Sequence, residues 1–161
     1  MVTQSQIDRL QRFYECHRQA LFTYALSLTG QGVEAEDLLH NVFAKLLEKG
    51  KLPLELRPYV FRMVRNGFID AARKQKVQQE PLFDLDLVHA DSPSRDLWLE
   101  LESSLEALGE QQREVIVLKS LDGLSFREVA NVLDKPMGTV VSLHRRGMEK
   151  LKNLLNKEKI A

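Results

Sequence analysis

The helical spacing of its apolar residues most constrains how this 161-residue chain can fold. From residue 7 to residue 28, apolar or ring-bearing side chains recur at alternating intervals of three and four. That interval is the period of one α-helical face, whereas a half-buried strand alternates every second residue. The positions are Ile7, Leu10, Tyr14, His17, Leu21, Tyr24 and Leu28. Gly30 and Gly32 follow and end the predicted helix.

The same period continues along the chain, with no convincing strand and no internal repeat. Glycine and proline separate the periodic segments and mark their ends. Pro58 falls in the first turn of its helix, where a missing N–H costs nothing. The predicted helices are Val33–Lys49, Arg57–Val77, one beginning near Asp96, Glu110–Leu121, Ser125–Leu133 and Thr139–Lys157. The pattern therefore predicts an all-α protein.

Charge divides the chain into three parts, although the total net charge is zero. Residues 1–77 hold 12 basic and 8 acidic side chains, residues 78–109 hold 1 and 8, and residues 110–161 hold 10 and 7. Residues 78–95 contain two prolines and no sustained period. We therefore expect two small helical domains, 1–77 and 96–161, joined by an acidic linker, 78–95. The basic ends favour nucleic-acid contact, and the acidic middle disfavours it.

Several classes of protein are excluded by what the sequence lacks. Cys16 is the only cysteine, and no Cys/His cluster has the spacing of a metal site. We find no nucleophile–base–acid set and no phosphate-binding glycine loop, so we expect no catalytic residue and no cofactor. No apolar stretch approaches the roughly 18 residues of a membrane span, and the first residues do not resemble a signal peptide. The expectation is a cytoplasmic, non-enzymatic protein.

The last two predicted helices suggest a helix-turn-helix. Ser125 and Glu128 form a capping box, and a tight turn at 134–138 containing Pro136 precedes the final basic helix. At about 100° per residue, one arc of that helix is apolar and the opposite arc is polar. The apolar arc holds Val140, Leu143, His144, Gly147, Met148, Leu151, Leu154 and Leu155; the polar arc holds Ser142, Arg145, Arg146, Glu149 and Asn153.

Arginine on the polar arc is suited to guanine in a major groove, although a solvated surface gives the same pattern. His144 lies within the apolar arc. We favour a packed core histidine there over a DNA contact.

The helix predicted over residues 57–77 carries a basic ridge, with six basic residues and one acid between Arg57 and Lys76. The ridge consists of Arg62, Arg65, Asn66, Arg73 and Lys76, and the opposite side of Val60, Val64, Gly67, Phe68 and Ala71. Such a ridge is suited to a phosphate backbone. The alternative is a solubilising face with local ion pairs to Asp70. The preceding helix, 33–49, is apolar around much of its circumference. This pattern fits either core packing or a contact surface for a partner helix.

Three stretches together resemble the extracytoplasmic-function (ECF) group of bacterial RNA polymerase sigma factors. They are AEDLLHNVFAKL at Ala35–Leu46, YVFRMVRNGFIDAARK at Tyr59–Lys74, and the segment Leu108–Leu155. The resemblance implies a three-helix sigma-two-like domain and a sigma-four-like helix-turn-helix domain. It implies core RNA polymerase and promoter DNA as partners, with promoter recognition and DNA melting as the function. An anti-sigma protein is a further partner common in the family.

The resemblance also assigns roles to particular residues. Polymerase binding falls on Asp37, Leu38, Asn41, Val42 and Lys45. Minus-ten contacts fall on Arg62, Arg65, Asn66, Arg73, Lys74 and Lys76, with an unstacked base captured near the loop Gly50–Leu56. Minus-thirty-five contacts fall on Thr139, Val141, Ser142, Arg145 and Arg146.

The final helix departs from the family at Val141, Leu143 and Met148, where lysine or arginine is common. Fewer cations predict a shallower salt dependence of DNA binding. Val141 is suited instead to a thymine methyl group.

The main alternative is a helix-turn-helix transcriptional regulator that acts on duplex DNA without a sigma role. Such a regulator should protect promoter DNA by itself and prefer two-fold sites. A sigma factor should protect the promoter only together with core polymerase. An enzyme is the second alternative. It is disfavoured because Cys16 and His17, as neighbours in one helix, point to different faces.

Overall fold

The computed structural model describes residues 2–75 and 103–160. The chain divides into two compact units, Met1–His89 and Ala90–Ala161. The division falls inside the predicted linker, 78–95, all of which, with Lys76, lies outside the described residues. The described residues contain helices and no strand, which confirms the all-α prediction.

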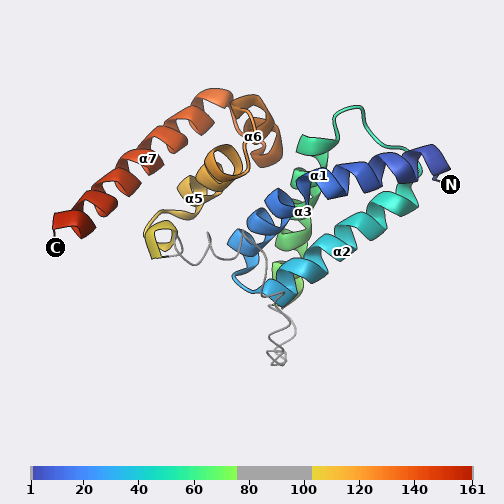
Figure 1. Ribbon diagram of the computed structural model, residues 1–161, viewed down its shortest axis with the longest axis horizontal. Coiled ribbons are helices and arrows are strands. Elements are labelled where there is room, and N and C mark those ends of the chain that lie inside the picture. Colours follow the sequence, from blue (N-terminus) through green and yellow to red (C-terminus); the bar gives the residue numbers. More distant parts are fainter. Residues whose placement is uncertain (1, 76–102, 161) are drawn as a thin grey trace. The chain divides into compact units, whose positions relative to one another are not determined.

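Over residues 2–75, the first unit contains three helices, α1 (Gln4–Thr29), α2 (Gly32–Lys49) and α3 (Leu56–Gln75), each of which contacts the other two (Figure 1). The glycine stops act as predicted. Gly30 ends α1 with φ of 75° and donates its N–H to the Leu26 carbonyl at 2.8 Å, and Gly50 ends α2 with φ of 73°. These left-handed conformations favour glycine because it has no Cβ.

The core of this unit is made from one face of each helix. Leu21, Tyr24, Leu46, Val60 and Phe61 are fully buried. The Tyr24 and Phe61 rings lie 5.7 Å apart between centroids, within the range of favourable aromatic pairs. Gly67 allows close approach of α3 to α2, because a Cβ there would lie 2.9 Å from Cδ1 of Leu38.

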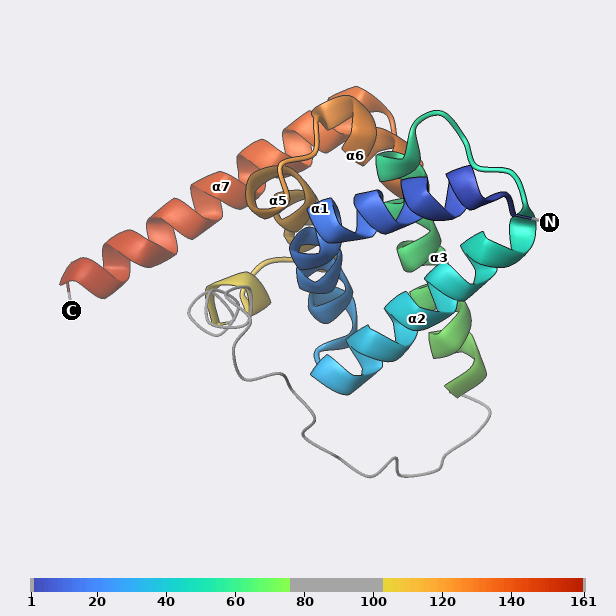
Figure 2. The ribbon, with the colours of Figure 1, turned by 45° about the vertical axis from the view of Figure 1, so that its right-hand side comes forward.

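The second unit contains α5 (Glu110–Ile116), α6 (Phe126–Leu133) and α7 (Met137–Ile160), preceded by a helical turn at 103–106. Arg113 ties that turn to α5, since its guanidinium donates to the carbonyls of Leu105, Glu106 and Leu108 at 2.9–3.3 Å. Both α5 and α6 pack against α7 (Figure 2). The buried side chains include Val115, Leu118, Leu124, Val129 and Val140.

Several helix boundaries differ from the prediction by one to three residues, and two of the differences have a visible cause in the backbone. The helix expected over 110–121 is α-helical only to Ile116 and continues as a π-helical turn, Val117–Leu121. There the Asp122 N–H donates to the Val117 carbonyl at 2.9 Å, five residues back. The final helix begins two residues early, at Met137, because the Pro136 carbonyl already accepts from the Val140 N–H at 3.1 Å.

Candidate nucleic-acid and protein interfaces

The basic ridge of α3 lies on the side of the helix away from the core. Asn66, Arg73 and Lys74 are exposed, and Arg62 and Arg65 are half-buried. Val60 and Val64 on the opposite side are fully buried. Asp70 is the only acid on α3. The exposed part of this helix is therefore strongly cationic, with an amide at its centre.

Two details of the predicted α3 wheel are corrected by the structure. Ala71 was placed on the buried side, but it is exposed. Phe61 was not predicted to be buried, but its exposure is zero. Ala71 is exposed because burial on α3 ends at Val64, whereas Phe61 lies beside the ridge, between it and the apolar side, and the wheel assigned it to neither.

The predicted polymerase-binding residues of α2 fall into two groups. Asp37, Asn41 and Lys45 are exposed and spaced by four residues, so they form one line along the helix. Leu38 and Val42 are 7% and 3% exposed, so they lie on the buried face of α2, and their assignment to polymerase binding stays a prediction. Both side chains belong to the core. They lie next to Gly67 of α3, whose missing Cβ leaves room for them.

The helix-turn-helix prediction is supported by the geometry around α6. The Ser125 hydroxyl accepts from the Glu128 N–H, and the Glu128 carboxylate accepts from the Ser125 N–H, both at 3.1 Å, which confirms the capping box. Asp134 ends α6 in the left-handed region, with φ of 52° and ψ of 51°. Aspartate tolerates this conformation better than most residues with a Cβ, and α7 follows after two more residues.

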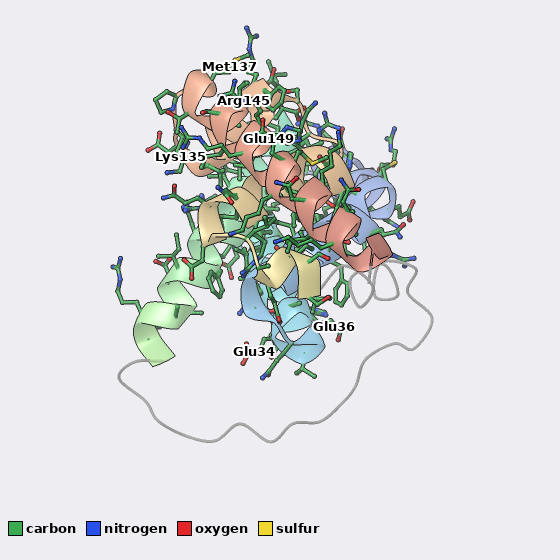
Figure 3. The ribbon with its side chains drawn as sticks, turned by 90° about the vertical axis from the view of Figure 1, so that its left-hand side faces the viewer. Glu34, Glu36, Lys135, Met137, Arg145 and Glu149 are labelled. Atoms are coloured by element: carbon green, nitrogen blue, oxygen red, sulfur yellow. The ribbon has the colours of Figure 1, made fainter. Side chains whose placement is uncertain are left out.

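The polar face of α7 is open to solvent. Thr139, Val141, Arg145 and Arg146 are exposed, and Ser142 is half-buried. Figure 3 shows Arg145 and Glu149 following one another along the same side of the helix, as their four-residue spacing requires. The opposite side meets α5 at Gly147, where a Cβ would lie 2.5 Å from Cδ1 of Ile116. The position of α7 is therefore fixed by close contact behind its cationic face.

His144 is only partly the core residue that was predicted. Its ring is half-buried, lies edge-on to Phe126 at 5.3 Å, and places Nε2 3.0 Å from the Ser120 hydroxyl. Burial lowers the pKa of His144, and the positive charge of Lys119 lowers it further. Lys119 itself lies 4.7 Å above the Phe126 ring. His144 thus links α7 to the π-helical turn and to α6.

Asp122, which the sequence did not single out, carries a buried carboxylate oxygen. Its Oδ2 has no hydrogen-bond partner among the described residues. Burial raises the pKa of the Asp122 carboxyl to about 9, so it is protonated at neutral pH. An aspartate directly before Gly123 looks like an ordinary turn residue, so the sequence pattern gives no sign of this burial.

Arg9 is a further residue that the sequence gave no reason to select, whereas Leu54 lies in the loop Gly50–Leu56 that the resemblance singled out. Arg9 on α1 donates to the carbonyls of Pro53 and Leu54 in the connection between α2 and α3. Leu54 is 95% exposed. No local pattern predicts a contact between residues so far apart in the chain.

Two kinds of site are not found in the part of the chain that the structure describes. Residues 2–75 and 103–160 contain no group of three His, Cys, Asp or Glu side chains placed to hold a metal ion. None of the described helices combines the length and the apolar character needed to cross a membrane.

The sequence matches two related protein-family models. Their order along the chain is the order of the two units. Residues 13–77 match Sigma-70 region 2, and residues 98–151 match Sigma-70, region 4. The first match lies within the first unit and the second match within the second unit.

Similar proteins of known class cover nearly the whole chain. The ECF RNA polymerase sigma factor SigE of Mycolicibacterium smegmatis is 28% identical over 88% of this chain, which spans 59% of SigE. The ECF RNA polymerase sigma factor SigM of Bacillus subtilis is 25% identical over 92% of this chain and 96% of SigM.

Among solved structures, the sigma factor RpoE of Bartonella quintana, in complex with the anti-sigma factor NepR, has a TM-score of 0.72 at 26% identity. The structural match covers 92% of this chain and 97% of RpoE. The two region matches, their order and these relatives agree with the resemblance found in the sequence. The chain therefore belongs to the ECF group of RNA polymerase sigma factors, and its role is in transcription initiation.

Proposed function

We propose that this sigma factor carries two cationic helix faces to successive elements of one promoter when core RNA polymerase holds it. In this proposal α3 contacts the minus-ten element and α7 reads the minus-thirty-five element. The observation that carries it is the exposure of both faces, one in the unit that matches region 2 and one in the unit that matches region 4. The factor needs no catalytic residue, metal or cofactor for this role.

The α3 contact is argued from charge and exposure. Arg73 and Lys74 project from the last turns of the described helix, and Asn66 lies further back along it. Arginine and lysine neutralise phosphates, whereas a short amide bonds to a base edge or to the backbone. Arg62 and Arg65, which are half-buried, bring the cationic surface close to the body of the domain, where a DNA strand would lie.

The α7 contact is argued from its exposed face. Arg145 and Arg146 can pair with guanine or with phosphate, and the exposed methyl groups of Val141 are suited to thymine. Thr139 and Ser142 can donate to bases or to the backbone. Glu149 on the same face adds a negative charge. This charge repels phosphate and reduces the net positive charge that α7 brings to the DNA groove.

Core polymerase is assigned to the exposed line on α2. Asp37, Asn41 and Lys45 present an acid, an amide and a base in sequence, which allows specific polar recognition without an apolar patch. We also propose an anti-sigma protein as a partner class, because RpoE of Bartonella quintana was solved in complex with the anti-sigma factor NepR. Such a partner should compete with core polymerase for this chain.

The test is run-off transcription and footprinting with purified core polymerase and a promoter library. The wild-type chain should protect both promoter elements and open the duplex only when core polymerase is present. Replacing Arg62, Arg65 and Arg73 together by glutamate should abolish open complexes while core binding persists. Glutamine at the same positions removes charge without reversing it and should give an intermediate loss.

A matched control and a contrary result complete this design. Arg18→Glu reverses one exposed cation on α1, a helix that carries none of the proposed DNA contacts, and should leave open-complex formation unchanged. Unchanged transcription by the triple variant would refute the assignment of α3. Protection of duplex promoter DNA by the chain alone, centred on two-fold sites, would favour the helix-turn-helix regulator instead.

A further inference from the structure

A ring nitrogen and a thioether sulfur of α7 converge on one hydroxyl group of the π-helical turn. Nε2 of His144 lies 3.0 Å from Oγ of Ser120, and the same hydroxyl donates to Sδ of Met148 at 4.0 Å. His144 and Met148 are four residues apart, so they are neighbours on one face of the helix. Two atoms that can bind a metal ion therefore both lie within 4.0 Å of one oxygen atom.

This point is accessible from solvent. Ser120 is exposed, Met148 is 42% exposed and His144 is half-buried. Because Ser120 is at the surface, its hydroxyl can turn to water without becoming a buried polar group that lacks a partner. The methionine side chain has three rotatable bonds, so its sulfur can adjust its position. A small ion can therefore reach the two donor atoms and replace the hydroxyl between them.

The imidazole ring of His144 is available as a ligand at neutral pH. Its burial and the positive charge of Lys119 lower the pKa of His144 below the ordinary value, so the ring is neutral there, as a metal ligand must be. In the neutral ring one nitrogen carries the proton and the other is a free donor. The tautomer with its proton on Nδ1 presents Nε2 to an ion.

The two donors favour a soft cation with a single charge. Thioether sulfur selects soft ions such as Cu(I), and imidazole binds copper as well. Among the described residues, His144 belongs to no group of three His, Cys, Asp or Glu side chains that could hold a metal ion, so it lacks the partners of a zinc site. Lys119, 4.7 Å above the Phe126 ring, brings a positive charge that repels a divalent ion more than a monovalent one.

We propose that His144 and Met148 form a binding site for a soft monovalent cation of the Cu(I) class on α7. The cation accepts lone pairs from Nε2 and Sδ. Ser120 is not a ligand, because hydroxyl oxygen is suited to harder ions. The inference does not rest on the proposed function, since neither ligand is among the proposed DNA contacts and binding requires no polymerase.

The experiment is an NMR titration of the full chain with isotope-labelled methionine methyl groups, in a Cys16→Ser background. The substitution removes an exposed thiol, which as a thiolate would bind the same ions. The probe is silver nitrate in chloride-free buffer, because Ag(I) shares the ligand preferences of Cu(I) without its redox chemistry. One equivalent should shift the methyl signal of Met148 and the ring signals of His144. Cu(I), supplied without oxygen from a chelator, should shift the same signals.

Matched variants test the two ligands. Met148→Leu keeps the side-chain volume but removes the sulfur. It should lower the affinity for Ag(I) by about tenfold or more, since even residues that only support a metal ligand commonly contribute that much. His144→Gln should cause a comparable loss. Met137→Leu is the control, because it removes a 54% exposed sulfur from the same helix and should leave the affinity unchanged.

Three results would overturn the site. The first is a titration in which Ag(I) shifts other methionine signals and leaves that of Met148 in place. The second is an affinity of the Met148→Leu variant equal to that of its parent. The third is tighter binding of Zn²⁺ than of Ag(I) at these residues, which would contradict the preference for a soft ion. The first and third are measured on the parent chain, so they decide the question even if a variant unfolds.

Discussion

The contact between α5 and α7 gives the sharpest stability prediction. A Cβ on Gly147 would lie 2.5 Å from Cδ1 of Ile116, 3.3 Å from its Cγ1 and 3.4 Å from Cβ of Gln112. Ile116 is 3% exposed, so its side chain has little room to move. Gly147→Ala should therefore cost about 1–3 kcal/mol of overpacking, set against a gain of roughly 1 kcal/mol in helix propensity. We expect a net loss of about 1 kcal/mol.

Removal of the one clashing atom should reverse this loss. Ile116→Val deletes Cδ1 and by itself should cost about 1 kcal/mol, the usual effect of losing a buried methyl group. In the double variant the alanine fits, so the two changes together should be about 1–2 kcal/mol less destabilising than their sum. Gly138→Ala is the matched control on the same helix, because nothing lies within 4 Å of its added Cβ. It should stabilise the unit slightly and add independently to Ile116→Val.

The assay is native-state hydrogen exchange of peptides from α5 and α7, which reports the opening free energy of this unit within the full chain. If Gly147→Ala stabilised these peptides as much as Gly138→Ala, the close contact would be refuted. Additivity of Gly147→Ala and Ile116→Val within about 0.5 kcal/mol would refute it as well.

Two other predictions concern the second unit. Because burial raises the pKa of the Asp122 carboxyl from 3.8 to about 9, the native state keeps a proton that the unfolded state loses. Stability should therefore fall as pH rises from about 4 to 9, by up to about 1.4 kcal/mol per unit. Asp122→Asn should flatten this slope in urea unfolding followed at α5 and α6, and an unchanged slope would contradict the burial of the carboxyl. Arg146→Ala should weaken holoenzyme binding to its minus-thirty-five element by about 1–3 kcal/mol if the guanidinium reads a base. An equal loss on scrambled sequences, measured by competition, would show that Arg146 contacts only phosphate.

Much of the fold follows from local signals in the sequence. The interval of three and four residues indicates α1 from Ile7 onward, and Gly30 ends it in the left-handed conformation that the stop signal implies. The capping box at Ser125 forms as its spacing requires. These features are predictable because each depends on hydrogen bonds and sterics within one or two turns of chain. The cationic faces of α3 and α7 follow from the same period.

Other features depend on which helices meet, and the sequence period carries no such information. Leu38 and Val42 share α2 with exposed Asp37 and Asn41, and only contact with α3 buries the first pair. The wheel placed Ala71 inside, but burial on α3 ends at Val64. A wheel gives direction around an axis, whereas burial also depends on how far along that axis a neighbour reaches.

By itself, the sequence determined the helices, the ends that glycine or a capping box marks, the charge of the outer faces and the family to which the chain belongs, because all of these depend on local spacing or on motif order. The tertiary structure alone decided that Arg9 holds the peptide groups at Pro53 and Leu54, that Gly147 faces Ile116, and that the Asp122 carboxylate is enclosed. Each of these depends on the separation of atoms that are brought together by packing. Such separations are set by the balance of many side-chain volumes, which no short stretch of sequence contains.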